Sequence, residues 1–227
     1  MASLTKEYIN YDPAMPPVLY HYCSVQTFVS IIENTNIWLS DANKTNDSTE
    51  TKWMFSKMQE VINQAIEKYK NKYDEDVLEL AKNITHQLIE NIVTKKAPID
   101  NNAKNFLICF SEAKDLLSQW RAYGNDGKGI AIGFNSSILA SLENSSGFSF
   151  TKVIYDSKKI MHFLHKSYDK QLEWAIKSCI DKKTKNINIQ ELMLQISVII
   201  ISIWREGFVF KHSCFSEEQE WRIFRKF

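Results

Sequence analysis

Apolar residues recur at helical spacing in four long stretches of the chain. Over 51–94 they recur every three or four residues, in two consecutive runs: Phe55, Met58, Ile62, Ala65, Ile66 and Tyr69, then Val77, Ala81, Ile84, Leu88 and Ile92. The same spacing continues from Lys158 to Ile180, and the stretch Ile189–Trp204 is mostly apolar. These patterns predict four helices, each with at least one buried face.

Shorter apolar runs predict strands and three short helices between the long ones. The predicted strands are Val18–Tyr22, Ile37–Leu39, Phe106–Phe110, Gly129–Phe134, Phe148–Tyr155, Gly207–Lys211 and Glu220–Phe227. The predicted short helices are Val25–Glu33, Leu116–Tyr123 and Asn135–Leu142. Because strands and helices alternate irregularly, we expect an α+β fold. We expect one domain over residues 1–227, with helical insertions at about 51–97 and 158–206. Asp47 is predicted to cap the first inserted helix.

Composition narrows the class of protein. The chain has 227 residues, is 44% hydrophobic and carries a net charge of +1, so no large basic surface for duplex nucleic acid is expected. The four cysteines are far apart and form no C-x-x-C pair, which favours a reduced, cytoplasmic setting. The N-terminus has no apolar segment of a secretory signal, and Ile196–Trp204 is too short to span a bilayer. We therefore expect a soluble protein with no membrane contact.

Two blocks contain more polar chemistry than folding requires. Residues 106–134 place the polar and aromatic side chains Ser111, Ser118, Gln119, Trp120, Arg121 and Tyr123 between two apolar strands. Residues 215–222 place Glu217, Glu218 and Glu220 directly before a strand. Glu218 and Glu220, two apart on a predicted strand, should leave the same face about 7 Å apart. The guanidinium of Arg121 suits a phosphate or carboxylate, or pairs with Glu220 or Glu112 as a structural bridge.

Ordinary structural roles also account for several of these residues. The acidic run is typical of a solvated turn before an edge strand. His21, at the end of an apolar strand, is compatible with a buried and satisfied core histidine. Residues 124–129 contain G-x-x-G-x-G, but between a helix and a strand, which is the reverse of a dinucleotide loop and indicates a turn. The histidines lie on unrelated segments, so no metal site is expected.

Four sequence blocks together resemble a known bacterial family. They are LYHYCSVQTFVSIIENTNIWLSD, N-D-x-x-E, CFSEAKDLLSQWRAYGNDGKGIAIGF and FKHSCFSEEQEWR, which run from about Leu19 to Trp221. The combination resembles the domain of unknown function numbered 2971, a family grouped with the ADP-ribosyltransferase-like superfamily. The resemblance implies a split, mostly antiparallel sheet that holds a cleft, with NAD as substrate and no metal.

The resemblance also implies roles for particular residues. His21, as a neutral imidazole, would donate to a ribose hydroxyl of NAD, and Tyr22 would offer a ring for stacking. Glu220 would stabilise the oxocarbenium-like cation formed when nicotinamide departs, and Glu218 would polarise an acceptor. Ser111 and Ser118 are the candidates for the middle strand position. Arg121 would hold the pyrophosphate, and Tyr123 completes the set of cofactor-binding residues. The cleft should then contain His21, Tyr22, Ser111, Arg121 and Glu220 together.

The function implied by the resemblance is NAD-dependent transfer or hydrolysis of ADP-ribose, in a toxin or defence effector. One alternative is a non-catalytic module that binds a nucleotide or a peptide. Another is a nuclease-like phosphate-ester enzyme that uses His21, Arg121 and the glutamates. The expected partner is a small-molecule nucleotide. A protein or nucleic-acid acceptor and the oligomeric state stay open.

Overall fold

The computed structural model describes residues 13–42, 49–94, 106–144, 147–181 and 186–225. The chain divides into a helical unit (Met1–Asp12, Thr49–Asp100 and Asp156–Phe210) and a sheet unit (Pro13–Ser48, Asn101–Tyr155 and Lys211–Phe227). The two predicted insertions, 51–97 and 158–206, supply the long helices of the helical unit. The mixed α+β class and the mostly antiparallel sheet are confirmed. The predicted cap Asp47 lies outside the described residues.

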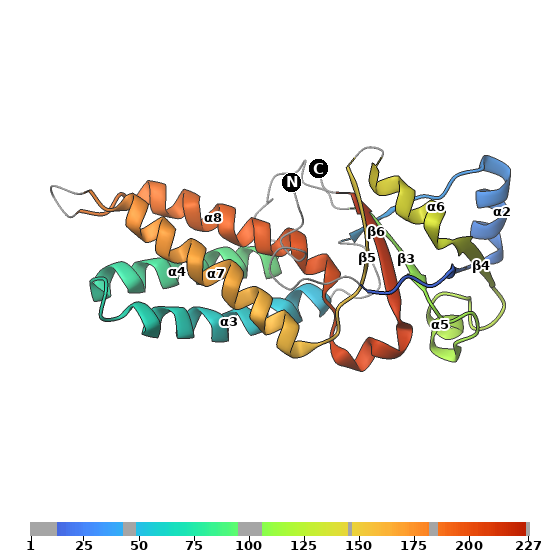
Figure 1. The fold of residues 1–227 in the computed structure, drawn as a ribbon, viewed down its shortest axis with the longest axis horizontal. Coiled ribbons are helices and arrows are strands. Elements are labelled where there is room, and N and C mark those ends of the chain that lie inside the picture. Colours follow the sequence, from blue (N-terminus) through green and yellow to red (C-terminus); the bar gives the residue numbers. More distant parts are fainter. Residues whose placement is uncertain (1–12, 43–48, 95–105, 145–146, 182–185, 226–227) are drawn as a thin grey trace. The chain divides into compact units, whose positions relative to one another are not determined.

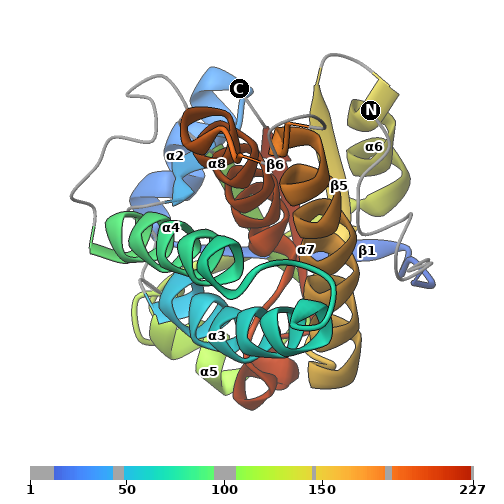
Figure 2. The same ribbon diagram turned by 90° about the vertical axis from the view of Figure 1, so that its left-hand side faces the viewer.

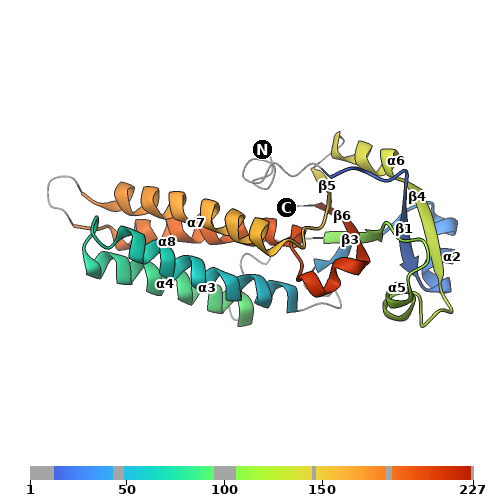
Figure 3. The same ribbon diagram turned by 60° about the horizontal axis from the view of Figure 1, so that its bottom comes forward.

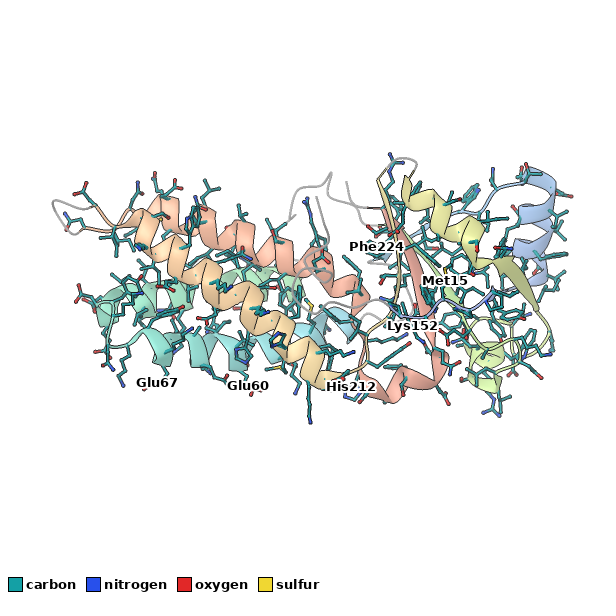
Figure 4. All side chains as sticks on the ribbon, viewed as in Figure 1. Met15, Glu60, Glu67, Lys152, His212 and Phe224 are labelled. Atoms are coloured by element: carbon teal, nitrogen blue, oxygen red, sulfur yellow. The ribbon has the colours of Figure 1, made fainter. Side chains whose placement is uncertain are left out.

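Four helices pack side by side in the helical unit: α3 (Thr49–Tyr69), α4 (Glu75–Thr94), α7 (Ser157–Cys179) and α8 (Ile189–Glu206) (Figure 1). Figure 2 looks along these helices and shows α8 beside α7 and α4 beside α3. Their apolar positions meet in one core, whose fully buried members include Met58, Ile62, Leu164, Tyr168, Leu172, Ile196 and Ile203. The polar positions of α3 face solvent, as Figure 4 shows for Glu60 and Glu67. The helical periodicity of the sequence thus corresponds to burial in this unit.

Polar contacts fix which flank of each helix faces which neighbour. On α7, Asp169 pairs with Lys68 of α3 and Glu173 pairs with Lys72. The hydroxyl of Tyr69 also donates to Glu173, at 3.2 Å. The Thr85 and Tyr168 hydroxyls, 2.8 Å apart and buried, connect α4 with α7. Asp169 and Glu173 therefore mark the flank of α7 that faces α3.

The sheet unit contains six strands: β1 (Val18–Cys23), β2 (Ser40–Asp41), β3 (Phe106–Ser111), β4 (Ile130–Asn135), β5 (Phe148–Lys152) and β6 (Glu220–Arg225). The strand order is β4-β1-β3-β6-β5 (Figure 3), and β2 pairs with β3. β1 pairs with β4 along its length, and β3 pairs with β6 from Phe106 to Ser111. Between β1 and β3, however, the register within the described residues consists of one pair, Tyr20 and Ser111. β1 and β3 are therefore joined over a shorter length than the other neighbouring strands of the sheet.

One face of the sheet carries an apolar core. The short helices α2 (Val25–Asn34), α5 (Leu117–Ala122) and α6 (Ser136–Ser141) and the 3-10 helix η4 (Ser213–Glu218) connect the strands. The core cluster comprises Leu19, Ile108, Phe110, Leu139, Phe150, Trp221 and Ile223. Because successive strand residues point to opposite faces, Ser111, Glu220 and Arg222 belong to the other face. These three residues are nonetheless buried.

Two of the predicted strands differ in the structure. The predicted strand Ile37–Leu39 becomes the two-residue β2, which starts at Ser40. The predicted strand Gly207–Lys211 is wrong, since residues Gly207–Val209 form the 3-10 helix η3. Gly207 has helical angles, φ −57° and ψ −23°, and its N–H donates to the carbonyls of Ile203 and Trp204. The apolar residues that follow are buried as a continuation of α8, so apolar character alone was a misleading strand signal.

Candidate functional site

The predicted catalytic carboxylates lie in a buried group of charges at the start of β6. Glu220 Oε1 accepts from Arg222 Nε at 2.7 Å, and Glu220 Oε2 accepts from Arg222 Nη2 at 3.1 Å. Lys211 Nζ donates to Glu220 Oε2 at 3.1 Å and to Glu218 Oε2 at 2.7 Å. We call these four residues, Lys211, Glu218, Glu220 and Arg222, the ion cluster. It contains two negative and two positive side chains, so its charges balance.

The charge state of each glutamate follows from burial and from these partners. Burial alone would raise the pKa of Glu220, but the charges of Arg222 and Lys211 outweigh it and lower the pKa to about 2. The Cys109 thiol, which donates to the same carboxylate, acts in the same direction. For Glu218 burial is the largest effect and raises the pKa, with the Glu220 charge adding to it and Lys211 opposing it. Glu220 is thus ionised at neutral pH, and Glu218 is the more easily protonated of the two.

The local backbone differs from the prediction that Glu218 and Glu220 share a strand. Glu218 ends η4, and Gln219 adopts a left-handed conformation with φ of 45° before β6 begins at Glu220. The two carboxylates converge on Lys211 because of this turn. The alternation of strand residues does not bring them together.

Ser111 and two tyrosines border the ion cluster. Ser111 pairs with Glu220 in the sheet, and its Oγ donates to the Glu218 carbonyl at 2.7 Å. The Tyr155 hydroxyl accepts from the Glu220 backbone N–H at 3.1 Å. Burial raises the pKa of Tyr123 to about 12, and the charges of Lys211, Glu218 and Glu220 also act on its hydroxyl. The structure therefore brings together four of the predicted residues: Ser111, Tyr123, Glu218 and Glu220.

His21 lies on the other side of the sheet. Tyr20, Ser111 and Glu220 are neighbours across three strands and share a face, so the adjacent His21 points to the opposite face. Its ring packs against Phe110 of the apolar core, with centroids 5.9 Å apart. The prediction that His21 and Glu220 border one cleft does not agree with this arrangement. The physical reason is that successive residues of a strand point to opposite faces of the sheet, so His21 and Glu220 lie on different faces although their strands are close together.

The hydrogen bond of His21 also defines its chemistry. His21 Nδ1 lies 3.0 Å from the carbonyl oxygen of Cys109. A carbonyl only accepts, so Nδ1 carries the proton. Burial lowers the pKa of His21, although the bond to Cys109 opposes that effect, and the ring is neutral. Nε2 is therefore an acceptor and carries no proton for the predicted donation to a sugar hydroxyl.

Tyr22 holds the segment that precedes α5. Its hydroxyl donates to the Ala113 carbonyl at 2.7 Å and accepts from the Leu116 N–H at 3.2 Å. Its buried ring meets Trp120 edge to face, with centroids 4.9 Å apart and planes at 82°. This environment accounts for Tyr22 by packing and hydrogen bonding.

A shallow pocket of about 560 Å³ lies between α5 and η4. It is lined by Leu116, Leu117, Ser118, Arg121, Ala122 and Glu217. Arg121 is exposed and forms no ion pair with the described residues. The buried Ser118 Oγ has no hydrogen-bond partner in the described part of the chain. The pocket therefore combines an exposed guanidinium with an apolar lining.

Arg121 does not form either of the structural bridges considered from the sequence. Glu220 is occupied by Arg222 and Lys211, as described above. Glu112 accepts from Trp221 Nε1 at 2.8 Å and pairs with Lys152 at 2.7 Å. Lys152, labelled in Figure 4, lies on β5.

The sequence analysis missed Lys211, Arg222, Tyr155 and Cys109 as members of the site. Arg222 could have been predicted from the sequence, because a residue two positions after Glu220 on the same strand shares its face. Lys211 could not have been predicted, because its contact with the two glutamates depends on the turn at η4. Within the described ranges no group of three or more His, Cys, Asp or Glu residues is arranged to hold a metal ion.

The comparison with protein families concerns the part of the chain that contains this site. Residues 119–223 match a family described as Protein of unknown function (DUF2971). The match supports that family. It covers Arg121, Tyr123 and the ion cluster, whereas His21, Ser111 and Ser118 precede it. No curated protein and no solved structure matches the chain.

Proposed function

We propose that the sheet unit is a binding module for a small phosphate-bearing nucleotide, in which the ion cluster stabilises the sheet and Arg121 contacts the phosphate. The observation that carries this proposal is the state of Glu220. Its side chain is 6% exposed, and both of its oxygens accept hydrogen bonds from Arg222 or Lys211. A carboxylate that stabilises a developing cation must face that cation without a competing partner. Glu220 faces two cations of its own chain.

The pocket beside α5 has the chemistry that such a ligand requires. A guanidinium binds phosphate oxygens through two parallel hydrogen bonds, and Arg121 is available for this. Leu116, Leu117 and Ala122 offer apolar area to a base or sugar. The volume of about 560 Å³ lies within the usual range for small-molecule pockets. Glu217 can accept from a ligand hydroxyl or amino group.

The binding proposal is tested by calorimetry and thermal shift with ADP-ribose, NAD and inorganic phosphate. A ligand at 100 times its Kd should stabilise the protein by about 2.7 kcal/mol. Arg121→Gln should abolish the shift, and Arg121→Lys should weaken it because the fork is lost. Lys114→Gln, a change at another exposed cation of the same unit, is the matched control. Equal ligand binding by the parent and Arg121→Gln would remove the proposal.

NAD-dependent transfer or hydrolysis of ADP-ribose, in a toxin or defence effector, is the second candidate. It is favoured by the short pairing between β1 and β3, which consists of Tyr20 and Ser111 within the described residues, and by the pairing of Ser111 with Glu220 of β6. A sheet joined at one residue pair is what a split sheet requires, and Glu220 is ionised at neutral pH. Catalysis would require Lys211 to move away from Glu220. Release of nicotinamide that depends on Glu220 would establish this candidate in place of a purely binding role.

A further inference from the structure

α8 exposes an apolar stripe on the side that faces away from the core of the helical unit. Leu192, Ile196, Ile199, Ile200 and Ile203 are buried. On the opposite side Leu194 is 58% and Val198 is 52% exposed, and Met193, on the flank between the two sides, is also exposed. No charged residue occurs between positions 192 and 204. A surface helix of a soluble protein normally presents charged or polar residues here.

An exposed tryptophan on α7 extends this stripe. Trp174 is 59% exposed. Asp169 and Glu173 mark the flank of α7 that faces α3. Successive helix residues are rotated by 100°, so Trp174 and Asp169 lie on opposite flanks of the buried stripe of α7. Trp174 therefore lies on the flank toward α8. Ile180 and Ile187 pair across the connection of the two helices. Trp174 is six residues before Ile180, and Met193 is six residues after Ile187, so the two residues lie at the same level of the antiparallel helix pair.

The outward side of α7 adds positive charge. Lys166, Lys170 and Lys177 recur at intervals of four and seven residues, which keeps them on one side of the helix. None of them forms an ion pair with the described residues. Of the nearby acids, Glu173 is paired with Lys72, and Glu191 stands at the first turn of α8. The face therefore combines aliphatic side chains, an exposed indole and unpaired lysines.

We propose that this outward face of the α7–α8 hairpin binds the surface of a membrane that contains anionic lipids. Aliphatic residues enter the boundary between headgroups and acyl chains, a tryptophan favours the interface, and lysines attract anionic headgroups. A second copy of the chain fits less well, because it would bring the same lysines without matching acids. Residues Ile189–Val209 are long and apolar enough to cross a membrane, yet half of an apolar 18-residue window within them is buried. The hairpin would thus lie on the surface.

This proposal departs from the expectation of no membrane contact. That expectation rested on the missing apolar segment of a secretory signal and on the short apolar run Ile196–Trp204. Neither observation describes the charge on one side of a helix, and the outward side of α7 is locally basic.

The test is flotation of the full chain with phosphatidylcholine vesicles, with and without 30% phosphatidylserine. The protein should bind the anionic vesicles, lose binding as salt rises, and show a blue-shifted tryptophan emission that Trp174→Phe reduces. Lys170→Gln with Lys177→Gln should weaken binding about 25-fold, at about fivefold for each lysine. Leu194→Ser with Val198→Ser should weaken it about tenfold or more.

Two exposed positions of the sheet unit provide the controls. Ile138→Ser and Lys114→Gln should leave vesicle binding unchanged. The proposal is overturned if anionic vesicles are not bound at low salt, or if the α7 and α8 variants bind as well as the parent. It is also overturned if light scattering shows a dimer that Leu194→Ser dissociates, because a second copy then covers the face.

Discussion

Lys211 and Glu220, nine residues apart in the chain, form a buried ion pair with an Nζ–Oε2 distance of 3.1 Å. The ammonium of Lys211 also binds Glu218 at 2.7 Å, and its side chain is 3% exposed. One lysine thus connects the turn before β6 to the first residue of that strand.

Lys211→Met should destabilise the sheet unit strongly. The substitution keeps the apolar stem of the side chain but leaves the two glutamates opposite Arg222 alone. Removing one partner of a buried ion pair costs about 3–5 kcal/mol. Urea unfolding at pH 7 measures the loss. Lys70→Met removes the exposed partner of Glu67 and should cost less than about 1 kcal/mol. If both variants lose the same stability, the ion cluster has no special role.

Acid should destabilise the protein through Glu220. Its folded pKa of about 2 lies below the ordinary value of 4.5, so its contribution is present above pH 4.5 and is lost as the pH falls toward 2. The difference corresponds to about 3 kcal/mol. The raised pKa of Glu218 acts in the opposite direction. Unfolding measured between pH 7 and 2.5 should show a gap between the parent and Glu220→Gln that closes with acid. A gap independent of pH would contradict the assignment.

Glu220→Gln separates the two candidate functions. If Glu220 stabilises an oxocarbenium, nicotinamide release should fall by about two to three orders of magnitude, or about 3–4 kcal/mol, while NAD binding changes little. Glu218→Gln should then affect transfer to an acceptor more than hydrolysis. If the ion cluster is structural, Glu220→Gln lowers the melting temperature, and the parent protein releases no nicotinamide. Ligand titration, melting curves and nicotinamide release measured on the same samples distinguish these outcomes.

Met58→Asp should disrupt the helical unit. Met58 is fully buried in α3, and an unpaired charge there should cost several kcal/mol. Gln59→Asp, at the next and exposed position, is the matched control and should change stability by about 0.5 kcal/mol or less. Helical circular dichroism during heating records both. An unchanged melting temperature for Met58→Asp would show that this packing is wrong.

The sequence by itself determined the helices and most strands. Residues such as Met58, Leu164 and Tyr168 recur every three or four positions, and this local spacing corresponds to burial whichever helices become neighbours. The family resemblance implied that residues 106–134 and 215–222 contribute to one cleft, and in the structure Ser111 of β3 is the register partner of Glu220 of β6.

Only the tertiary structure decided which groups meet and in what state. It placed His21 on the face opposite Glu220, turned Glu218 toward Lys211, and left Arg121 without an ion pair among the described residues. These outcomes depend on strand register and on one left-handed residue, Gln219. The physical reason is that the periodic spacing of buried residues is a local property of the sequence, so it predicts helices and strands without knowledge of their neighbours. The partner of a charged side chain, in contrast, is chosen by contacts between segments far apart in sequence.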